Sequence, residues 1–426
     1  MELFKNIKQK DWSTMVSLPT IDKEQLDQIV NTILKNVKED GDNALRAYTQ
    51  KFDNVDLAEF LVSEAEIQKA KKLVSKELMQ AINIAKQNIE KFHKSQFIEE
   101  QVIETSVGVE CWRKSVAIEK VGLYIPGGSA PLFSTVLMLG VPAKLANCEE
   151  IVLCTPSNDQ GEINPAILYT ANLIGITKIY KVGGAQAVAA MAYGTETIPQ
   201  VYKIFGPGNQ FVTKAKELVQ QSGISIDMPA GPSEVLVIAD KTGNPEYIAA
   251  DLLSQAEHGA DSQVILLSDC ENILTQTLIQ LEKQVLLLPR SETAKKALSN
   301  SKAFLLNNME ECMDFSNLYA PEHLIIASND ASKYIDKVIN AGSVFLGNYS
   351  CESAGDYASG TNHTLPTNGY ARNYSGVSLD SFQKKITFQK ITKEGIQAIG
   401  PSIEIMAESE QLFAHKNAVT LRLKDL

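Results

Sequence analysis

KIYKVGGAQAVAAMAY, residues 178–193, is the stretch that decides the fold. Residues 178–182 form a short apolar, strand-like segment that ends at the glycine pair 183–184. A segment of small residues with the length of a helix, 185–193, follows directly. A strand, a glycine turn and a helix in immediate succession are typical of parallel α/β sheets. Ligands of such sheets bind beyond the carboxyl ends of the strands, which is where this glycine turn lies.

The same unit recurs on both sides of this stretch. Before it, the strand-like residues 151–154 precede a helical segment at 164–174. After it, residues 204–205 run into the turn GPGN at 206–209 and a helical segment at 211–221. A second series of apolar strands follows at residues 234–238, 264–267, 323–326 and 343–346. The predicted fold class is therefore α/β with parallel sheets.

The amino-terminal part of the chain carries a different pattern. Residues 1–20 have the character of an arm, whereas residues 21–51 and 64–94 show helical periodicity with charged outer faces. A β-rich stretch follows at 98–125 and breaks at the turn PGG, residues 126–128. We expect helices and then strands before the parallel α/β series begins.

The carboxyl-terminal part combines a long loop, a strand and a helix. Residues 347–376 are rich in Gly, Ser, Asn and Tyr without periodicity, and such a loop is usually functional or disordered. Residues 382–426 begin strand-like and continue as a helix from about Pro401. On one ideal helix Glu410 and His415 would point roughly 140° apart. Either the helix ends between them, or the two side chains meet different partners.

Length and charge limit the possible partners. A chain of 426 residues is expected to hold two or three domains. A net charge of −11 disfavours nucleic acid or an anionic membrane as the main partner. Residues 1–12 have no apolar signal core, and no run approaches a membrane span. The six cysteines form no CxxC pair, which is typical of free thiols in a reducing compartment. We therefore expect a cytoplasmic protein that binds neither nucleic acid nor membrane.

The stretch LSQAEHG, residues 253–259, looks like the end of a helix. Asn244 can cap its start, and Gly259 stands where a left-handed carboxyl-terminal cap is expected. Gln255 lies on the inward-facing stripe of this helix, and His258 follows three residues later on the same side. The pair is either half of a metal site or a hydrogen-bonded polar pair within a core. These residues alone leave both interpretations open.

Other polar residues stand at strand ends and in the long loop. Glu322 and His323 lie side by side at the mouth of a strand, as a general acid/base unit would. A surface glutamate beside a half-buried histidine fits the same pattern. Asp356 and His363 bracket one part of the long loop. These positions are candidates for chemistry.

The glycine turns give only a weak indication of a nucleotide cofactor. The GxGxxG fingerprint is absent, because residues 206–211 keep two glycines and lack the third. Glycine turns before helices can hold phosphate, but they also serve as plain connections in α/β folds. The turns by themselves leave cofactor binding open.

Eight blocks, in this order along the chain, resemble the histidinol dehydrogenase family. They are GLYIPGG (122–128), VGGAQA (182–187), FGPGN (205–209), MPAGPSEV (228–235), QAEHG (255–259), APEHL (320–324), GDY (355–357) and EQLFAH (410–415). Each block alone is modest evidence, whereas all eight in order are highly specific. The first 100 residues add length and helical pattern but no motif.

The resemblance implies a reaction, cofactors and site residues. Members of the family oxidise L-histidinol to L-histidine through L-histidinal, the last step of histidine biosynthesis, and use zinc and two NAD in turn. The resemblance makes His323 the base and Glu322 the residue that activates water. The implied zinc ligands are Gln255, His258, Asp356 and His415. The implied NAD-binding residues are Tyr124, Gln186 and Asn209. The implied substrate contacts are Ser233 and Glu410, together with Gln255, His258, His323, Asp356 and His415, and His363 is expected nearby.

The resemblance also implies the domain organisation. We expect two Rossmann-like α/β domains with incomplete dinucleotide-binding topology, and small terminal segments that mediate dimerisation. The expected division is an arm (1–20), a discontinuous domain with most of the zinc and catalytic site (21–123 and 234–376), an NAD-binding domain (124–233), and a dimerisation segment (377–426) that supplies Glu410 and His415. The expected assembly is a homodimer with shared active sites.

Two other functions use the same residues. His258, Asp356, His415 and Glu322 would also suit a zinc hydrolase, with a metal and a water-activating carboxylate but no nucleotide. A non-catalytic protein with a structural zinc between its subunits is the second alternative. NADH formation from L-histidinol would distinguish the dehydrogenase from both.

Overall fold

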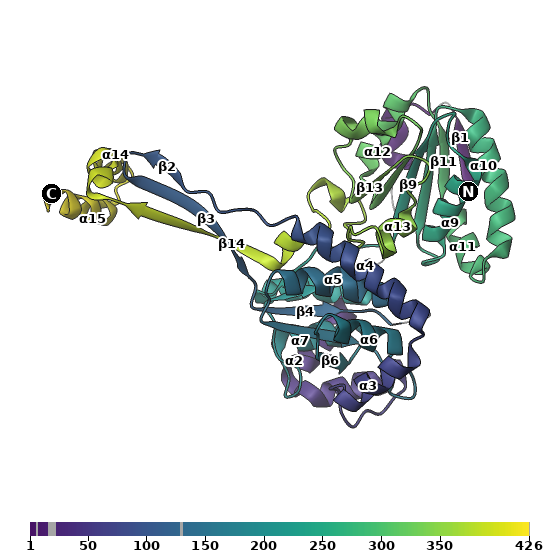
Figure 1. The fold of residues 1–426 in the computed structure, drawn as a ribbon, viewed down its shortest axis with the longest axis horizontal. Coiled ribbons are helices and arrows are strands. Elements are labelled where there is room, and N and C mark those ends of the chain that lie inside the picture. Colours follow the sequence, from purple (N-terminus) through teal and green to yellow (C-terminus); the bar gives the residue numbers. More distant parts are fainter. Residues whose placement is uncertain (6, 16–22, 128–130, 426) are drawn as a thin grey trace.

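The computed structural model describes residues 1–5, 7–15, 23–127 and 131–425, which form two parallel sheets covered by helices and one projecting arm (Figure 1). The predicted α/β class with parallel sheets is confirmed. The predicted border between residues 20 and 21 lies outside the described residues, as does Gly128 at the end of the motif GLYIPGG. None of the described helices is long and apolar enough to cross a membrane.

A five-stranded parallel sheet holds the strands that the opening stretch predicts. In spatial order its strands are β6 (Lys178–Lys181), β5 (Glu150–Thr155), β4 (Lys120–Tyr124), β7 (Lys203–Phe205) and β8 (Ser225–Ile226). Numbered along the chain, this order is 3-2-1-4-5, with the direction of winding reversed between β4 and β7. A crevice opens at the carboxyl ends of the strands at such a reversal, which makes it the expected ligand position.

Helices cover both faces of the five-stranded sheet. One face carries α2 (Lys23–Asp53), α7 (Gly184–Tyr193) and α8 (Gln210–Val219). The other carries α3 (Glu64–Leu73), α4 (Lys76–Lys94), α5 (Phe133–Leu145) and α6 (Pro165–Leu173). The resemblance grouped residues 21–123 with 234–376, whereas α2, α3 and α4 pack against helices of the five-stranded sheet. Periodicity along the chain shows which face of a helix is buried, but not which sheet it meets.

The amino-terminal helices are less regular than the sequence pattern predicts. The prediction of one helix over 64–94 is wrong, because α3 and α4 separate at Val74 and Ser75. The Ser75 hydroxyl accepts a hydrogen bond from the Leu78 amide and so begins a new helix. Helix α2 is interrupted at Gly41, whose φ of 51° is left-handed. Both irregularities depend on a single cap or turn residue, and the spacing of apolar residues along the chain does not reveal such residues.

A six-stranded parallel sheet forms the second domain. In spatial order its strands are β1 (Glu2–Lys5), β11 (Lys302–Leu305), β10 (Gln263–Ser268), β9 (Glu234–Ala239), β12 (His323–Ala327) and β13 (Ser343–Leu346). Numbered from β9, the order is again 3-2-1-4-5, and β1 adds an edge strand by pairing Glu2 with Lys302. One face is covered by α9 (Pro245–Ala256), α10 (Glu271–Gln284) and α11 (Ser291–Ser299), and the other by α1 (Trp12–Met15) and α12 (Met309–Tyr319).

Helix α9 connects two parallel neighbours, β9 and β10, and this sets where its ends lie. It begins near the carboxyl end of β9 and must return to the amino end of β10. Its last residues, including Gln255, therefore lie at the same sheet edge as His323, the first residue of β12. The fold thus brings together two motifs that are 68 positions apart in the sequence.

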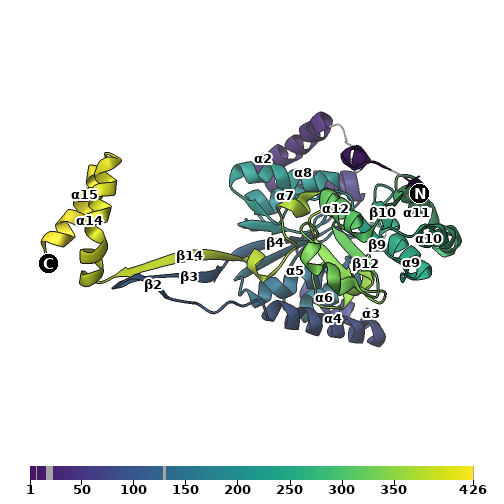
Figure 2. The same cartoon turned by 90° about the horizontal axis from the view of Figure 1, so that it is seen from above.

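The projecting arm joins two distant parts of the chain. It consists of β2 (Ile103–Ser106), β3 (Val109–Ala117), β14 (Gln383–Ile391), α14 (Lys393–Ser409) and α15 (Phe413–Lys424). Strands β3 and β14 pair antiparallel over their full length, and the helices at their far end lie well away from both sheets (Figures 1 and 2). Helix α14 begins at Lys393 rather than near Pro401, because Pro401 stands inside it. Helix α14 ends at Ser409, just before Glu410, and α15 (Phe413–Lys424) carries His415. The two residues therefore do not share one helix, although the predicted end between them falls slightly earlier.

Candidate active site

A glutamate and a histidine open strand β12 at the amino edge of the six-stranded sheet. The Nδ1 atom of His323 lies 3.1 Å from the carbonyl oxygen of Glu234, the first residue of the neighbouring strand β9. The Glu234 amide donates to Oε2 of Glu322 at 2.8 Å. Both side chains are buried. The carbonyl partner favours the tautomer with hydrogen on Nδ1, which leaves the Nε2 lone pair of His323 free.

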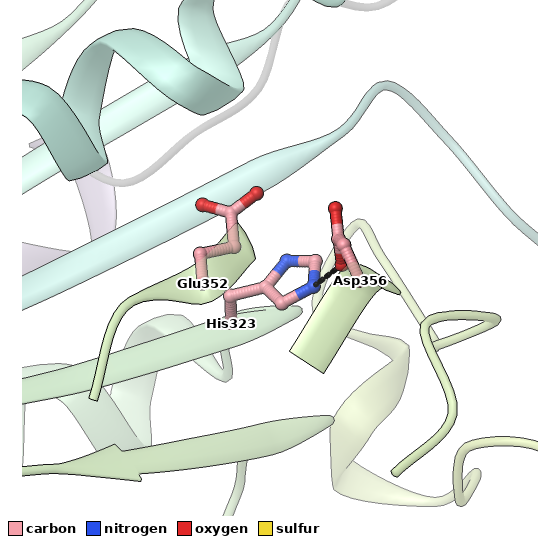
Figure 3. Close-up of side chains that lie close together, drawn as sticks. All are labelled: His323, Glu352 and Asp356. Atoms are coloured by element: carbon pink, nitrogen blue, oxygen red, sulfur yellow. Dashed lines mark ion pairs between the residues drawn. The ribbon is translucent and has the colours of Figure 1, made fainter. Parts of the chain in front are cut away.

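A short helix in the long loop faces this histidine. Glu352 and Asp356 lie on α13 (Glu352–Tyr357) at positions i and i+4, and both point toward His323 (Figure 3). Nε2 of His323 is 3.6 Å from Oδ1 of Asp356, too long for a hydrogen bond, and both atoms are buried without a hydrogen-bond partner. Potential ligand atoms of the three residues lie within 4.8 Å of one another. The arrangement is a compact cluster of metal-ligating groups.

Gln255 and His258 border this cluster from the end of α9. The Gln255 amide is fully buried, and its nitrogen can donate to Oε2 of Glu322 at 3.3 Å. In this orientation the amide oxygen is 2.5 Å from Oε1 of Glu352, where two acceptors repel unless a proton or cation lies between them. The reversed amide instead donates to Glu352 and accepts from the Glu234 amide at 2.9 Å. A cation in the cluster favours the first orientation, and its absence favours the second.

The imidazole of His258 reaches solvent on one side. Desolvation on its other side lowers the pKa of His258, against the raising effect of Asp356. His258 is therefore near the cluster, but it is not one of the three residues whose ligand atoms come within 4.8 Å of one another. Of the four predicted zinc ligands, only Asp356 belongs to that group of three.

The cluster gathers four acidic side chains around the imidazole of His323. Burial, the largest effect, raises the pKa of Glu234 and Glu352 to about 8 and that of Glu322 to about 7. Burial lowers the pKa of His323, but Glu322, Glu352 and Asp356 outweigh it and raise that pKa to about 10. Among the described residues, no lysine or arginine forms an ion pair with these four carboxylates (Glu234, Glu322, Glu352, Asp356). A carboxylate cluster of this kind, with unpartnered nitrogen and oxygen atoms, suits a divalent cation.

The sequence prediction missed Glu352. Its signal was the spacing Glu-x-x-x-Asp to Asp356, which places two carboxylates on one face of a helix. That spacing lies within residues 347–376, which were predicted as an irregular loop. A helix of six residues is too short to produce a periodic pattern in the sequence. The spacing could therefore be interpreted only once the fold was known.

The structure places the remaining predicted substrate-site residues at different distances from the cluster. Ser233 directly precedes β9 and lies at the same sheet edge as His323. Glu410 and His415 are exposed on the arm, and within one chain they are not brought to the cluster (Figure 2). His363, by contrast, is close: its Nδ1 lies 3.0 Å from the carbonyl oxygen of Asp356. Its Nε2 lies 3.1 Å from the Thr135 hydroxyl on α5, so His363 links the cluster to the five-stranded domain.

The three predicted cofactor residues line one cavity in the five-stranded domain. The cavity has a volume of about 990 Å³ and is lined by Tyr124 at the end of β4, Gln186 on α7 and Asn209 before α8. It lies at the carboxyl ends of the strands, where the winding reverses. The Tyr124 hydroxyl accepts a hydrogen bond from the Gly184 amide at 3.0 Å. This size and lining suit a ligand as large as a dinucleotide.

Gly206, in the turn before Asn209, packs closely against the backbone of Tyr124. Its φ is 129°, and a Cβ atom there would lie 2.1 Å from the carbonyl oxygen of Tyr124. The turn is anchored by a buried ion pair between Lys216 and Asp227. Lys216 donates to the Gly206 carbonyl and Asp227 accepts from the Gly206 amide, both at 2.8 Å. The motif FGPGN is therefore a rigid connection as well as part of the cavity wall.

Comparisons with known proteins agree with one another. Residues 17–423 match the family model described as histidinol dehydrogenase. The chain is 57% identical to the histidinol dehydrogenase of Bacteroides thetaiotaomicron, over 100% of both chains. It is 54% identical to that of Haemophilus influenzae, over 95% of this chain and 93% of the relative.

A solved structure of the same family is also similar to this chain. The crystal structure of histidinol dehydrogenase from Elizabethkingia anophelis superposes with a TM-score of 0.98 at 63% sequence identity. The match covers 100% of this chain and 98% of that chain. The family model, the relatives and the solved structure all cover nearly the whole sequence, with both sheets and the arm included. The chain therefore belongs to the histidinol dehydrogenase family.

Proposed function

We propose that this protein oxidises L-histidinol to L-histidine through L-histidinal, with zinc and two NAD, as the last step of histidine biosynthesis. Family membership makes the chain a dehydrogenase of that pathway. The observation that carries the proposed mechanism is the cluster around His323, where a proton-accepting nitrogen and a buried carboxylate lie beside metal-ligating groups. The free cysteines suit the reducing cytoplasm, where we place the reaction.

His323 is the proposed base of both oxidation steps. Its Nδ1 hydrogen is held by the Glu234 carbonyl, so Nε2 accepts the hydroxyl proton of the substrate as a hydride leaves for NAD. As water adds to the aldehyde, Nε2 returns this proton to the aldehyde oxygen, and it is then free to take a hydroxyl proton of the hydrate in the second oxidation. Burial fixes the ring, so little reorganisation is needed between the two steps.

Glu322 is the proposed base for water. One of its oxygens, Oε2, accepts from the Glu234 amide, which leaves Oε1 to take a proton from water attacking the aldehyde. Burial raises the pKa of Glu322 to about 7, so the group can both accept and release a proton near neutral pH.

Gln255, His258, Asp356 and a His415 from a second copy are the proposed zinc ligands. The unpartnered Oδ1 of Asp356, in a cluster with which no lysine or arginine of the described residues forms an ion pair, supports a cation at this position. When bound, zinc would fix the amine and imidazole of the substrate and bring the raised pKa of His323 back toward neutrality. Ser233 and Glu410 complete the proposed substrate contacts.

We assign NAD to the 990 Å³ cavity and its binding to Tyr124, Gln186 and Asn209. The strand order 3-2-1-4-5 in both sheets supports two Rossmann-like domains that each lack the strand that follows position 5 in the order 3-2-1-4-5-6. Strand β1 lies at the opposite edge of its sheet, beside β11. His415 lies on an arm that does not reach the cluster of its own chain, which supports a homodimer with shared sites. Residues 377–426, with β2 and β3, are then the dimerisation segment.

The test of this function is a stoichiometry. Purified, zinc-loaded protein is supplied with L-histidinol and excess NAD, and the NADH formed and L-histidinol consumed are both measured. We expect two NADH for each L-histidinol consumed. Folded, zinc-loaded protein that forms no NADH would refute the proposal.

We predict that Glu322→Gln slows the aldehyde step more than the alcohol step. The amide keeps the shape of Glu322 but cannot take a proton from water, so oxidation of added L-histidinal should fall by about 100-fold or more. The first turnover, measured as the first NADH in a rapid-mixing experiment, should change much less. Equal losses in the two steps would remove Glu322 from the water-activating role.

A further inference from the structure

We propose that Asp53 selects NAD over NADP by accepting a hydrogen bond from the 2′-hydroxyl of the adenine ribose. The inference rests on the proposed function, because it assigns NAD to the large cavity. Asp53 is the last residue of α2 and lines that cavity together with Tyr124. Neither the sequence motifs nor the cluster around His323 assigns a role to Asp53.

Asp53 is a half-buried carboxylate without a protein partner. Its Oδ2 atom is buried and has no hydrogen-bond partner, and no ion pair joins Asp53 to a cation among the described residues. The other charged residues of the cavity wall are engaged. Glu162 pairs with Lys69 at 2.7 Å, and Lys51 lies over the ring of Phe52 at 5.3 Å. A half-buried carboxylate in a cavity wall is stabilised by a hydrogen-bond donor of the ligand.

A dinucleotide offers neutral hydrogen-bond donors to Asp53 in its ribose hydroxyls, its adenine amino group and its nicotinamide amide. Its phosphates are anionic and are repelled by a carboxylate, and they suit the amino end of a helix such as α7, which begins in the cavity wall at Gly184. The ribose hydroxyls are neutral donors. A carboxylate on a ribose 2′-hydroxyl is a frequent solution for NAD, and it rejects the 2′-phosphate of NADP by charge.

The position of Asp53 favours the adenine ribose over the nicotinamide ribose. The nicotinamide must lie near His323, and the catalytic cluster meets the five-stranded domain at Thr135 of α5, through His363. Helix α5 covers one face of the sheet, whereas α2, which carries Asp53, covers the other. Asp53 therefore lies on the side of the cavity away from the catalytic contact.

The test measures equilibrium binding of three dinucleotides to zinc-loaded full-length protein by calorimetry. They are NAD, NADP and 2′-deoxy-NAD, the analogue of NAD that lacks the 2′-hydroxyl of the adenine ribose. We expect the parent protein to bind NAD about 10- to 100-fold more tightly than 2′-deoxy-NAD, and NADP more weakly still. Asp53→Asn should reduce the NAD preference over NADP by at least about tenfold. The control is Asp56→Asn, which removes the same charge from an exposed position three residues further on and should leave the preference unchanged.

The outcomes separate this inference from the proposed function. If the parent protein binds NAD and 2′-deoxy-NAD equally, or if Asp53→Asn keeps the full NAD preference, the role of Asp53 is refuted while NAD use stands. If the parent protein binds none of the dinucleotides, the cofactor assignment fails and the inference fails with it. The comparison with 2′-deoxy-NAD needs no variant, so the inference stays testable even if Asp53→Asn does not fold.

Discussion

Replacing His323 with asparagine is expected to lower the rates of both hydride transfers by about 100- to 10,000-fold, the range for loss of a positioned general base. An asparagine amide can still donate to the Glu234 carbonyl, as Nδ1 does at 3.1 Å, so the local fold should persist. It has no equivalent of the Nε2 lone pair that takes the substrate proton. The measurement is kcat with L-histidinol and with L-histidinal, together with bound zinc by elemental analysis.

A second buried histidine provides the control. His93 on α4 is also fully buried, and its Nδ1 also lies near a carbonyl oxygen, that of Ile89 at 2.9 Å. It packs near Asn362, outside the catalytic cluster. His93→Asn should therefore cost stability, seen as a lower Tm, and leave kcat nearly unchanged. If His323→Asn keeps its turnover while retaining zinc, His323 is not the base.

Mixing two inactive proteins is expected to restore activity, because the proposed site draws residues from two chains. His323→Asn has a defective cluster and an intact arm, whereas His415→Ala has an intact cluster and a defective arm. A heterodimer of the two contains one complete site. Random pairing of equal amounts makes about half of all dimers heterodimers, each with one complete site. The mixture should therefore reach about a quarter of the parent activity and isolated heterodimers about half, from near zero for each protein alone. The measurement is NADH formation by heterodimers isolated with two different affinity tags.

The control pairs two lesions of the same cluster. His323→Asn and Asp356→Asn both damage the body of the protein and leave both arms intact, so their heterodimers contain no complete site and should stay inactive. If the control heterodimers regained activity, something other than active sites shared between two chains would have restored it. Verified His323→Asn and His415→Ala heterodimers without activity would show instead that each site is built within one chain.

The sequence was sufficient to predict the fold class but not the packing of distant elements. The strand-turn-helix repeats and the cap at Asn244 are local signals, and the corresponding strands and helix α9 form as expected. The pairing of β3 with β14 joins residues more than 260 positions apart and leaves no local trace. The side of the molecule to which α2, α3 and α4 belong is hidden for the same reason, because only one apolar stripe is visible in each helix.

The candidate site was partly predictable. Glu322, His323 and Asp356 lie in motifs, and the fold brings them together. The glycine turns suggested ligands at the carboxyl ends of strands, which fits the cavity around Tyr124. The cluster around His323 lies instead at the amino ends of β9 and β12, and its acidic side chains include Glu234 and Glu352. Those two carboxylates become meaningful only when the strand order and the turn of α13 are known.

The pairing of the first strand with a very late one has a consequence for synthesis on the ribosome. Glu2 pairs with Lys302, so residues 2–5 must wait for a segment made 300 positions later, roughly 15 to 60 seconds at ordinary translation rates. All strands of the five-stranded sheet are complete by Ile226, so this sheet can form on the nascent chain before Val377, Leu379 and Phe382 complete its core. The edge of the other sheet and the pairing of β3 with β14 come last, so the five-stranded sheet is the first part of the chain that can act as a template for the rest.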